Sequence, residues 1–386
     1  MKDLLLCKPG EIFLKGLNKH YFEERLVANV KRRLKPIGHF RVTYLQSALY
    51  IEAADDTADL DAAYDAVRKV FGIATITRAA ACEKDKDAIT ALAKSYLHDA
   101  MTAAHSFKVE TKRSDKRFPM TSIELSQYVG GELAEAFPDT VVDVHNPELT
   151  VRLEVREQAA YVHAQAVEAA GGMPVGCNGA AVTLLSGGID SPVSSYMIAK
   201  RGVKIDAVYF HAPPYTSDRA KQKVVDLAKL VARYSGPIPL HVVNFTDIQL
   251  YIYEQCPHEE LTIIMRRYMM KIAEEIAKKS DSLALITGES IGQVASQTVQ
   301  SLAATNEVCT MPVFRPLIGF DKQEIIDISE KIGTFETSIQ PFEDCCTIFV
   351  AKHPVTKPNL NIIHKSETKL EEKIEKLDRE MECRRA

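Results

Sequence analysis

The sequence predicts a multidomain α/β protein in which small α+β units precede a domain built on a parallel sheet. At roughly 100 to 200 residues per domain, a chain of 386 residues corresponds to two or three domains. The pattern of helices and strands changes near residue 172, in a glycine-rich connection, and alternates regularly beyond it. These observations exclude a single small module.

The N-terminal half contains two predicted α+β units. In residues 1–58, apolar side chains recur every four residues from Tyr21 to Leu34, which predicts a helix, and residues 40–51 alternate like strands. Residues 59–167 form the second unit. Apolar residues in it recur with helical periodicity from Leu60 to Phe71, and further helices are predicted over 87–103 and 121–137. Its predicted strands cover 106–111, 141–144, 149–155 and 160–166. A linker over 168–178 follows.

Residues 179–386 alternate between strands and helices, which predicts a parallel sheet with right-handed helical connections. The predicted strands cover 181–185, 204–210, 238–244 and 282–287, and the predicted helices cover 192–201, 217–234, 259–278 and 290–302. A helical stripe of apolar residues over 368–383 predicts a packed terminal helix.

Composition places the chain among soluble proteins with substantial cores, since 46% of its residues are hydrophobic and 26% are charged. The longest uncharged stretch, 169–189, contains six glycines and a proline, so it predicts a linker rather than a membrane span. The apolar run at the N-terminus is too short for a signal peptide. We therefore expect a cytoplasmic protein without a membrane partner. The eight cysteines include no CxxC pair, which disfavours a structural zinc site, and we expect no dedicated metal site.

Positive charge is concentrated in the N-terminal half, although the formal net charge is −4. Residues 1–50 contain ten Lys or Arg and four Asp or Glu. A second basic cluster lies in the segment KVETKRSDKRFP at 108–119. Either cluster alone is as compatible with a solvated surface as with a binding site, but two clusters in one half favour RNA. The candidate RNA-binding residues are Lys31, Arg32, Arg33, Lys112, Arg113, Lys116 and Arg117.

The most informative segment is LLSGGIDSP at 184–192. It leaves an apolar strand, turns at two glycines and enters a helix with a proline near its first turn. Backbone amides in such a turn, together with the helix dipole, bind an anion, and the glycines let a phosphate approach the backbone. The chain contains no Walker A pattern GxxxxGK[ST]. Asp190 either caps the helix or, beside a bound pyrophosphate, holds Mg²⁺ or orients the attacking oxygen.

The motif SGGIDS resembles the pyrophosphatase loop of enzymes that transfer AMP from ATP to a substrate and release pyrophosphate. Further segments are similar to the tRNA 4-thiouridine synthetase (ThiI) family: GEIFLKG at 10–16, HAPPYTS at 211–217, TGES at 287–290 and DCC at 344–346. The resemblance covers nearly the whole chain. It implies that residues 1–58 are a ferredoxin-like domain, that 59–167 are an RNA-binding THUMP domain, and that 179–386 are a Rossmann-like pyrophosphatase-loop catalytic domain.

The resemblance also implies the reaction. Such enzymes use ATP with Mg²⁺ to adenylate the uridine at position 8 of tRNA and then replace its O4 with persulfide-derived sulfur, which gives 4-thiouridine. Carried over by position, the implied nucleotide-binding residues are Leu184, Leu185, Ser186, Gly187, Gly188, Asp190, Ser191, Tyr209, Phe210, Arg266, Gly288 and Gln297. A solvated role remains open for Arg266 and Gln297, and more so for Arg267.

The expected catalytic residues are Cys346, Cys345 and Asp190. Cysteine attacks as its thiolate, and positive charge nearby favours that form. Cys346 matches the family position of a catalytic-domain cysteine better than Cys345. Many family members carry a C-terminal rhodanese domain that receives sulfur, but this chain ends about 40 residues after the pair, so we expect a cysteine desulfurase to load the pair directly. The sequence leaves open whether the protein acts in thiamin thiazole synthesis and which of the two cysteines carries the persulfide. It also leaves open the oligomeric state, for which a homodimer is one option.

Two other functions remain as alternatives. One is an AMP-forming or amidating ligase of the pyrophosphatase-loop class that activates a carboxylate, which would explain the loop but not the basic N-terminal half. The other is a tRNA-binding module whose nucleotide site is only structural, and the intact SGGIDS motif argues against it.

Overall fold

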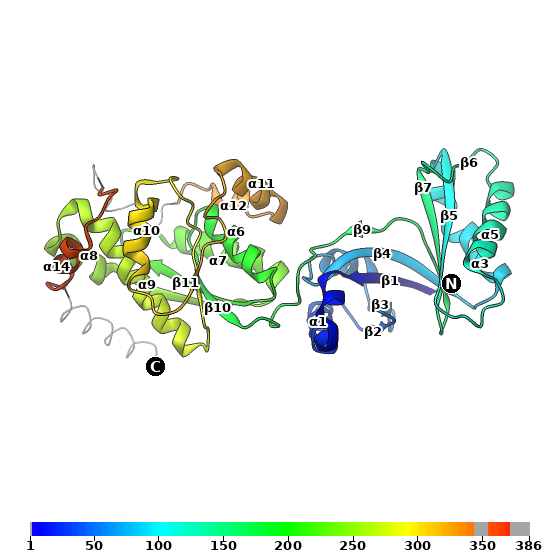
Figure 1. The fold of residues 1–386 in the computed structure, drawn as a ribbon, viewed down its shortest axis with the longest axis horizontal. Helices are drawn as coiled ribbons and strands as arrows, with labels where there is room; N and C mark the ends of the chain where they lie inside the picture. The colour runs from blue at the N-terminus through cyan, green and yellow to red at the C-terminus, as the bar shows by residue number, and fades with distance from the viewer. Residues whose placement is uncertain (1, 343–353, 371–386) are drawn as a thin grey trace. The chain divides into compact units, whose positions relative to one another are not determined.

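The computed structural model describes residues 2–342 and 354–370 (Figure 1). The chain divides into two compact units, Met1–Met173 and Pro174–Ala386. The division falls inside the segment 168–178, where the sequence predicts a linker. Among the described residues, no helix has the length and apolar character that crossing a bilayer requires.

The described part of unit 1, Met1–Met173, contains one nine-stranded sheet with the order β2-β3-β1-β4-β8-β7-β5-β6, and β9 pairs with β4. Its strands are β1 (Lys2–Pro9), β2 (Phe40–Leu45), β3 (Ala48–Ala53), β4 (Ile73–Cys82), β5 (Ser106–Arg113), β6 (Val141–Val142), β7 (Leu149–Val155), β8 (Ala160–His163) and β9 (Val167–Glu168).

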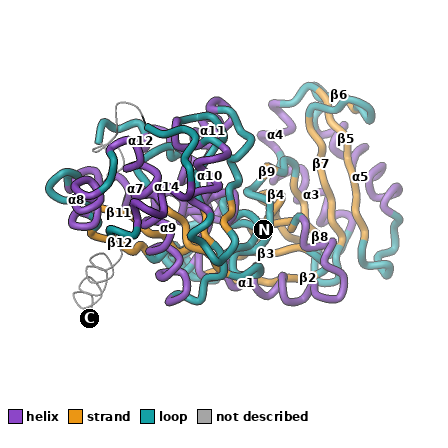
Figure 2. Tube along the Cα trace, turned by 60° about the vertical axis from the view of Figure 1, so that its left-hand side comes forward, coloured by secondary structure: helices purple, strands orange, loops and turns teal. Residues whose placement is uncertain are grey.

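The helices of unit 1 are η1 (Glu11–Asn18), α1 (Lys19–Leu34), α2 (Leu60–Val67), α3 (Lys86–Tyr96), α4 (His98–Ala103) and α5 (Ser122–Ala136). The four-residue apolar spacing of α1 is confirmed, because Phe22, Leu26 and Val30 are buried. Helix α5 begins with a capping box formed by Thr121 and Glu124. Helices α3 and α5 pack side by side, against β8 and β5 respectively (Figure 2).

Strand β4 was not predicted from the sequence, and it changes the relation between the two predicted α+β units. It pairs with β1 on one side and with β8 on the other, both antiparallel. Its sequence, IATITRAAAC, is rich in alanine, which is not enriched in strands. The ladder partners on both sides compensate for this weak local preference. Residues 1–58 and 59–167 therefore share one sheet.

Two predicted helices differ from the structure. The single helix predicted over 87–103 is divided into α3 and α4 at Leu97, whose φ and ψ of −102° and 13° are not helical. The helix predicted from residue 290 begins only at Val299, with the Thr298 hydroxyl as its N-cap. Gly292, at φ +79°, interrupts the earlier part of that segment.

Unit 2, Pro174–Ala386, is built on a parallel sheet with the order β12-β11-β10-β13-β14 in its described part. The strands are β10 (Ala180–Leu184), β11 (Lys204–His211), β12 (Leu240–Asn244), β13 (Leu285–Ile286) and β14 (Val313–Phe314). The helices are α6 (Asp190–Ala199), α7 (Asp218–Ser235), α8 (Thr246–Gln255), η2 (His258–Glu260), α9 (Leu261–Lys279), η3 (Ala295–Gln297), α10 (Val299–Asn306), α11 (Lys322–Ile332), α12 (Phe335–Ser338) and α14 (Leu360–Glu367).

Helices cover both faces of this sheet, and successive side chains of β11 pack against helices on opposite faces. Val208 and Phe210 belong to the core cluster that includes α9, whereas Ala207 and Tyr209 pack with Val224 of α7. Successive strand residues point to opposite faces, so a strand covered on both sides is apolar throughout. From β10 the chain adds β11 and then β12 on one edge of the sheet, and it crosses back to add β13 and then β14 on the opposite side of β10.

Arg267 joins α9 to α14 inside unit 2 and is not the solvated residue that the sequence favoured. Its side chain is 2% exposed, and its Nε and Nη2 donate to the two carboxylate oxygens of Glu367, both at 2.8 Å. Its Nη1 donates to Glu307 at 2.8 Å. A bidentate pair of this kind satisfies both buried charges.

Replacing Arg267 by methionine is expected to lower the free energy of unfolding by about 3 kcal/mol or more, because it leaves the carboxylate of Glu367 buried without its partner. Thermal or urea unfolding of the whole chain measures the change. Lys229→Met removes the exposed ion pair with Asp226 and serves as the control, with an expected loss below about 1 kcal/mol. Equal effects of the two substitutions would contradict the structural role assigned to Arg267.

Candidate functional site: a nucleotide cavity at the strand ends

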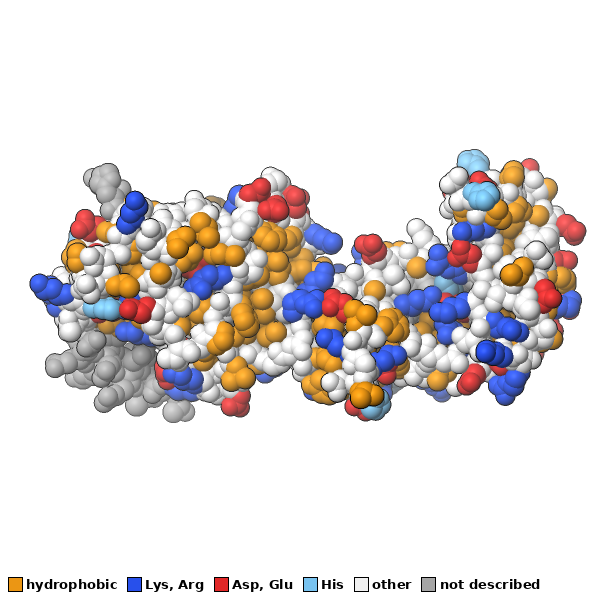
Figure 3. All heavy atoms as spheres, viewed as in Figure 1, with side chains coloured by type: hydrophobic (Ala, Val, Ile, Leu, Met, Phe, Trp, Pro, Cys, Tyr) orange, Lys and Arg blue, Asp and Glu red, His pale blue; other side chains and the backbone are white. Residues whose placement is uncertain are grey.

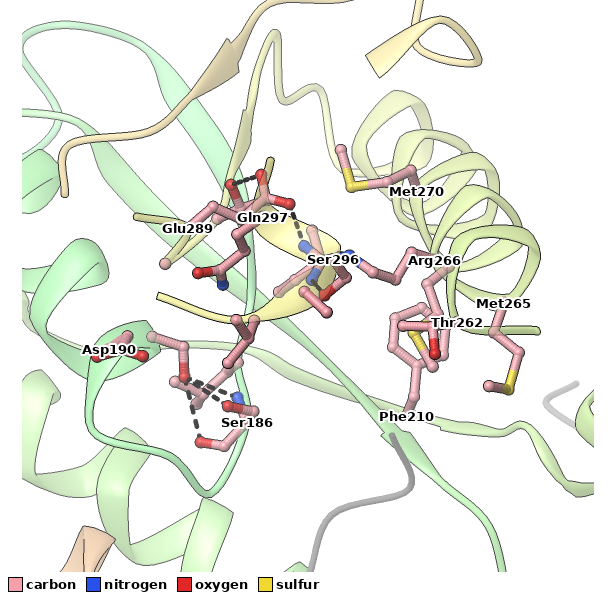
Figure 4. Close-up of a pocket in the computed structure, with 18 of the residues that line it drawn as sticks. Ser186, Asp190, Phe210, Thr262, Met265, Arg266, Met270, Glu289, Ser296 and Gln297 are labelled. Carbon is pink, nitrogen blue, oxygen red and sulfur yellow. Dashed lines mark hydrogen bonds and ion pairs between the residues drawn. The ribbon is translucent and has the colours of Figure 1, made fainter. Parts of the chain in front are cut away.

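A cavity of about 480 Å³ lies at the carboxyl ends of β10, β11 and β13, beside α9 and the segment 288–297 (Figure 4). In an open parallel sheet, ligands bind at this edge where the strand order reverses, and β10 is that point here. The predicted nucleotide residues that line the cavity are Leu184, Leu185, Ser186, Asp190, Ser191, Tyr209, Phe210, Arg266, Gly288 and Gln297. Gly187 and Gly188 belong to the same loop but do not line the cavity. Cys345 and Cys346 lie outside the described residues.

Hydrogen bonds that involve Ser186 and Ser191 hold the loop between β10 and α6 in its conformation. The Ser186 N–H donates to Ser191 Oγ at 2.9 Å, and that hydroxyl donates to the Ser186 carbonyl at 3.2 Å. The Gly188 N–H donates to Ser186 Oγ at 3.3 Å. The sequence predicts that amides throughout the loop face an anion, but two of them already have hydroxyl partners inside the loop. The N-terminus of α6 remains suited to an anion, because helix N-termini favour negative charge.

Asp190 lies at the start of α6 and is held by two side chains from distant segments. Gln293 Nε2 donates to its Oδ2 at 2.9 Å, and Lys322 Nζ lies 2.7 Å from its Oδ1. Lys322 opens α11 and is 132 residues away in the chain. Sequence reasoning missed both residues, because neither belongs to a motif. Their contact brings a cation to the phosphate end of the cavity.

The opposite end of the cavity is largely apolar and is formed by Phe210 and by one face of α9. Met265, Met269 and Met270 line it at helical spacings. Methionine adapts to flat and irregular ligands, and apolar walls with a few polar groups are typical of ligand pockets. The sequence analysis did not identify these methionines, because a helical apolar stripe by itself indicates only a core. This end suits a nucleobase, and the end at Ser186 suits phosphates.

A buried cluster around Glu289 also lines the cavity. Glu289 accepts a hydrogen bond from Thr287 Oγ1 at 2.8 Å and pairs with Arg315 at 2.7 Å and with Arg266. Burial raises the pKa of Glu289, but the charges of Arg266 and Arg315 outweigh it, so the pKa lies below its usual value. The carboxylate therefore stays ionised, and each arginine is partly neutralised.

Gln297 is a further polar group of the wall. It is buried, and its Oε1 has no hydrogen-bond partner among the described residues. An unpaired buried acceptor is costly, and a bound ligand or water that donates a hydrogen bond offsets that cost. This observation fits the expectation that Gln297 contacts a nucleotide.

The predicted RNA-binding residues lie in unit 1, where Figure 3 shows lysine and arginine side chains gathered on the face turned to the viewer. Lys31, Lys112 and Lys116 are exposed. Arg113 donates to the carbonyls of Phe118 and Met120 at 2.9 and 3.0 Å, so it also shapes its own loop. Two of the remaining candidates have partners within unit 1, since Arg32 donates to Asn29 and Arg117 pairs with Asp115. Arg33 is partly buried, and this burial lowers its pKa.

A hollow of about 540 Å³ lies close to this basic surface, in the wall formed by β5, β7 and α5. Its lining includes the hydroxyl groups of Ser122 and Ser126 and three cations, Lys8, Lys112 and Arg152. Two of these cations pair with carboxylates of the same hollow, Lys8 with Glu154 and Arg152 with Glu110. Lys8 and Arg152 were not among the predicted residues, because Lys8 lies on β1, apart from the residues selected at 31–33, and Arg152 lies on β7 outside both basic clusters.

Three family models match the chain: the ThiI ferredoxin-like domain over residues 4–77, the THUMP domain over 83–164, and thiamine biosynthesis protein (ThiI) over 176–372. A probable tRNA sulfurtransferase of Lachnoclostridium phytofermentans is 58% identical over 98% of this chain and 96% of that protein. One of Lachnospira eligens is 57% identical over the same shares.

Among solved structures, a 4-thiouridine synthetase crystallised with RNA and bound ATP is 37% identical, with a TM-score of 0.86 over 95% of this chain and 94% of that one. The protein PH1313 of Pyrococcus horikoshii is 19% identical with a TM-score of 0.65, covers 86% of this chain and 99% of its own, and shows the fold alone. From the family model over residues 176–372 and the near full-length relatives, the chain belongs to the ThiI family.

Proposed function

We propose that this chain is an ATP-dependent tRNA sulfurtransferase that adenylates the uridine at position 8 of tRNA and replaces its O4 with sulfur, giving 4-thiouridine. Residues 1–167 would bind the tRNA, and residues 179–386 would carry the chemistry. The observation that carries the proposal is the cavity at the strand ends, which joins an anion-binding loop to an apolar wall. The relatives' names and the 37% identical synthetase solved with RNA and ATP support it.

The two ends of the cavity suggest one orientation for ATP. Its phosphates would lie against the loop from Ser186 to Ser191, where the helix N-terminus favours negative charge. Its adenine would lie against Phe210 and the methionines of α9, with Arg266 and Gln297 as hydrogen-bonding groups. This orientation leaves the α-phosphate between the two ends and accessible to a substrate oxygen.

The first step would form a bond between uridine O4 and the α-phosphorus and break the bond to pyrophosphate. Lys322, beside Asp190, would offset the negative charge of the departing pyrophosphate. Adenylation converts O4 into a good leaving group. A sulfur nucleophile would then add to C4, and AMP would leave.

Mg²⁺ is expected with the nucleotide. In residues 2–342 and 354–370, no three acidic, histidine or cysteine side chains come together as a metal site. Mg²⁺ in nucleotide sites usually takes one or two carboxylates, waters and phosphate oxygens, so Asp190 alone suffices as the protein ligand. When bound, the ion would neutralise phosphate charge. Asp190 would have to exchange the contact with Lys322 for it.

The sulfur carriers that we propose are Cys346 and Cys345, loaded as a persulfide by a cysteine desulfurase. Four of the five described cysteines are unsuited to carry the sulfur. Burial raises the pKa of Cys82, Cys256 and Cys309 to about 11 and that of Cys7 still further, so these thiols are not thiolates at neutral pH. A vicinal pair also provides a second thiol to break the sulfur–sulfur bond after transfer.

The alternatives differ in what triggers pyrophosphate release. A ligase that activates a carboxylate would release pyrophosphate with a small acid and without tRNA. A tRNA-binding module with a structural nucleotide site would not turn over ATP.

We expect 4-thiouridine in tRNA after incubation with ATP, Mg²⁺, cysteine and a desulfurase, measured by mass spectrometry of the nucleosides. Asp190→Ala is expected to reduce both thiolation and tRNA-dependent pyrophosphate release at least a hundredfold, because it removes the carboxylate at the phosphate end. Unmodified tRNA with the wild-type chain, or turnover unaffected in the variant, would contradict the proposal.

Cys346→Ser or Cys345→Ser is expected to abolish thiolation while tRNA-dependent pyrophosphate release continues, because adenylation does not need the thiol. The measurement pairs nucleoside mass spectrometry with a pyrophosphate assay on the same samples. Cys309→Ser is the matched control in the same unit and should retain thiolation, since burial keeps that thiol protonated. Full thiolation in both variants of the pair would rule out its role.

Binding of tRNA is expected to weaken steeply with salt, because lysine contacts to phosphates release counterions. Lys112→Ala and Lys116→Ala should each reduce the slope of log K against log salt by about 0.9. Lys94→Ala, whose lysine pairs with Glu132 at 2.7 Å, is the control and should leave the slope unchanged. Filter binding at several salt concentrations measures it, and a flat response would remove the basic surface from the proposal.

A further inference from the structure

The turn after β13 carries a carboxylate that the nucleotide site described above does not use. Glu289 belongs to the segment TGES at 287–290, and only its neighbour Gly288 is assigned to the nucleotide. The Glu289 residue is 3% exposed, yet it lines the cavity. A buried carboxylate is retained in a protein only when its charge and hydrogen bonds are satisfied.

Three groups satisfy Glu289, and they come from three different segments. Thr287 Oγ1 donates to Oε2 at 2.8 Å from the same turn. Arg315 Nε donates to Oε2 at 2.7 Å from the end of β14. Arg266 Nη2 donates to Oε1 from α9. Arg315 is itself fixed, since its Nη1 donates to Asn306 Oδ1 at 3.0 Å.

Of these three groups, Arg266 is the one expected to touch the nucleotide. Figure 4 shows its side chain reaching from α9 toward Glu289 and Ser296, and its Nη1 lies 3.4 Å from Ser296 Oγ. A long arginine side chain loses rotamer freedom when it is held in one place. The pair with Glu289 restricts the Arg266 side chain before the ligand binds, so binding does not have to orient the guanidinium.

The same turn also touches the phosphate loop. A Cβ on Gly288 would lie 2.8 Å from the carbonyl carbon of Asp190 and 2.9 Å from the backbone nitrogen of Ser191. Only glycine permits this close approach. Glu289 therefore follows directly the glycine that packs against the loop that would hold the phosphates, and its side chain holds Arg266 in the same cavity.

We propose that Glu289 is a positioning residue that holds the Arg266 guanidinium in the nucleotide cavity and thereby sets the affinity for ATP, with Arg315 and Thr287 fixing the carboxylate. The inference rests on the proposed function, because ATP is the nucleotide assigned to the cavity. It adds a residue that acts through Arg266 rather than on the reacting atoms.

The test is steady-state kinetics of tRNA-dependent pyrophosphate release by the whole chain. Glu289→Gln keeps the shape of the side chain but removes its charge. We expect KM for ATP to rise about tenfold or more, the effect of losing one oriented hydrogen bond to a charged group. We expect kcat at saturating ATP and KM for tRNA to change less than about threefold, since the binding lost is the same in the ground state and the transition state.

Two further variants separate positioning from a merely structural role. Thermal unfolding of Glu289→Gln is measured on the same samples, and if that variant does not fold, Thr287→Val decides the question, because it removes only one hydrogen bond to Glu289. Its KM for ATP should rise about threefold. Glu307→Gln is the matched control: Glu307 pairs with Arg267, the next residue along α9, and its loss should leave KM for ATP within about twofold of the wild type.

A double-mutant cycle gives the decisive result. In an Arg266→Gln background, Glu289 has no guanidinium left to orient in the cavity. The added Glu289→Gln substitution should then change KM for ATP by less than about twofold. Additive effects of the two substitutions, or a folded Glu289→Gln protein with wild-type KM, would overturn the inference. Failure of the proposed function appears separately, as a wild-type chain that binds no ATP in calorimetry and releases no pyrophosphate with tRNA.

Discussion

The catalytic half of this protein depends on the parallel pairing of β10 with a strand on each side. Strands β11 and β13 run in the same direction as β10, so the carboxyl ends of all three meet at one edge. Leu184 and Phe210 lie at the carboxyl ends of β10 and β11, and Gly288 follows β13. The three come together in one cavity, although Leu184 and Gly288 are 104 residues apart in the chain. The loop, the apolar wall and the carboxylate cluster are all arranged around that edge.

Charge in the cavity is organised in pairs. Asp190 is matched by Lys322 and by an amide of Gln293, and Glu289 is matched by two arginines. Because each carboxylate has partners, a negatively charged nucleotide does not meet an uncompensated anion. The loop at Ser186 and the apolar wall of α9 give the cavity a polar end and an apolar end, which is the polarity that the proposed transfer of AMP from ATP requires.

The N-terminal unit obeys a different constraint, which is the continuity of one sheet through β4. That strand is paired on both sides, so α1 and β5, which carry the predicted RNA-binding residues, belong to the same sheet-based unit. A basic surface assembled from α1, β5 and their loops keeps a set geometry only if the strands between them are paired. Lys8 of β1 and Arg152 of β7 join that surface, and neither was among the residues predicted from the sequence.

Local patterns in the sequence determined the amphipathic helix α1, the alternation of strands and helices after residue 179, and the loop at 184–192, because periodicity, glycines and caps act over a few residues. Most of the residues that resemblance assigned to the nucleotide line one cavity. Tertiary structure decided what depends on distant partners: β4 became a strand through its two neighbours, Arg267 was buried because Glu367 pairs with it, and Lys322 reached Asp190 across 132 residues. Burial and charge pairing depend on residues that are distant in the sequence and meet only in the folded chain. The residues next to a position in the sequence therefore do not determine them.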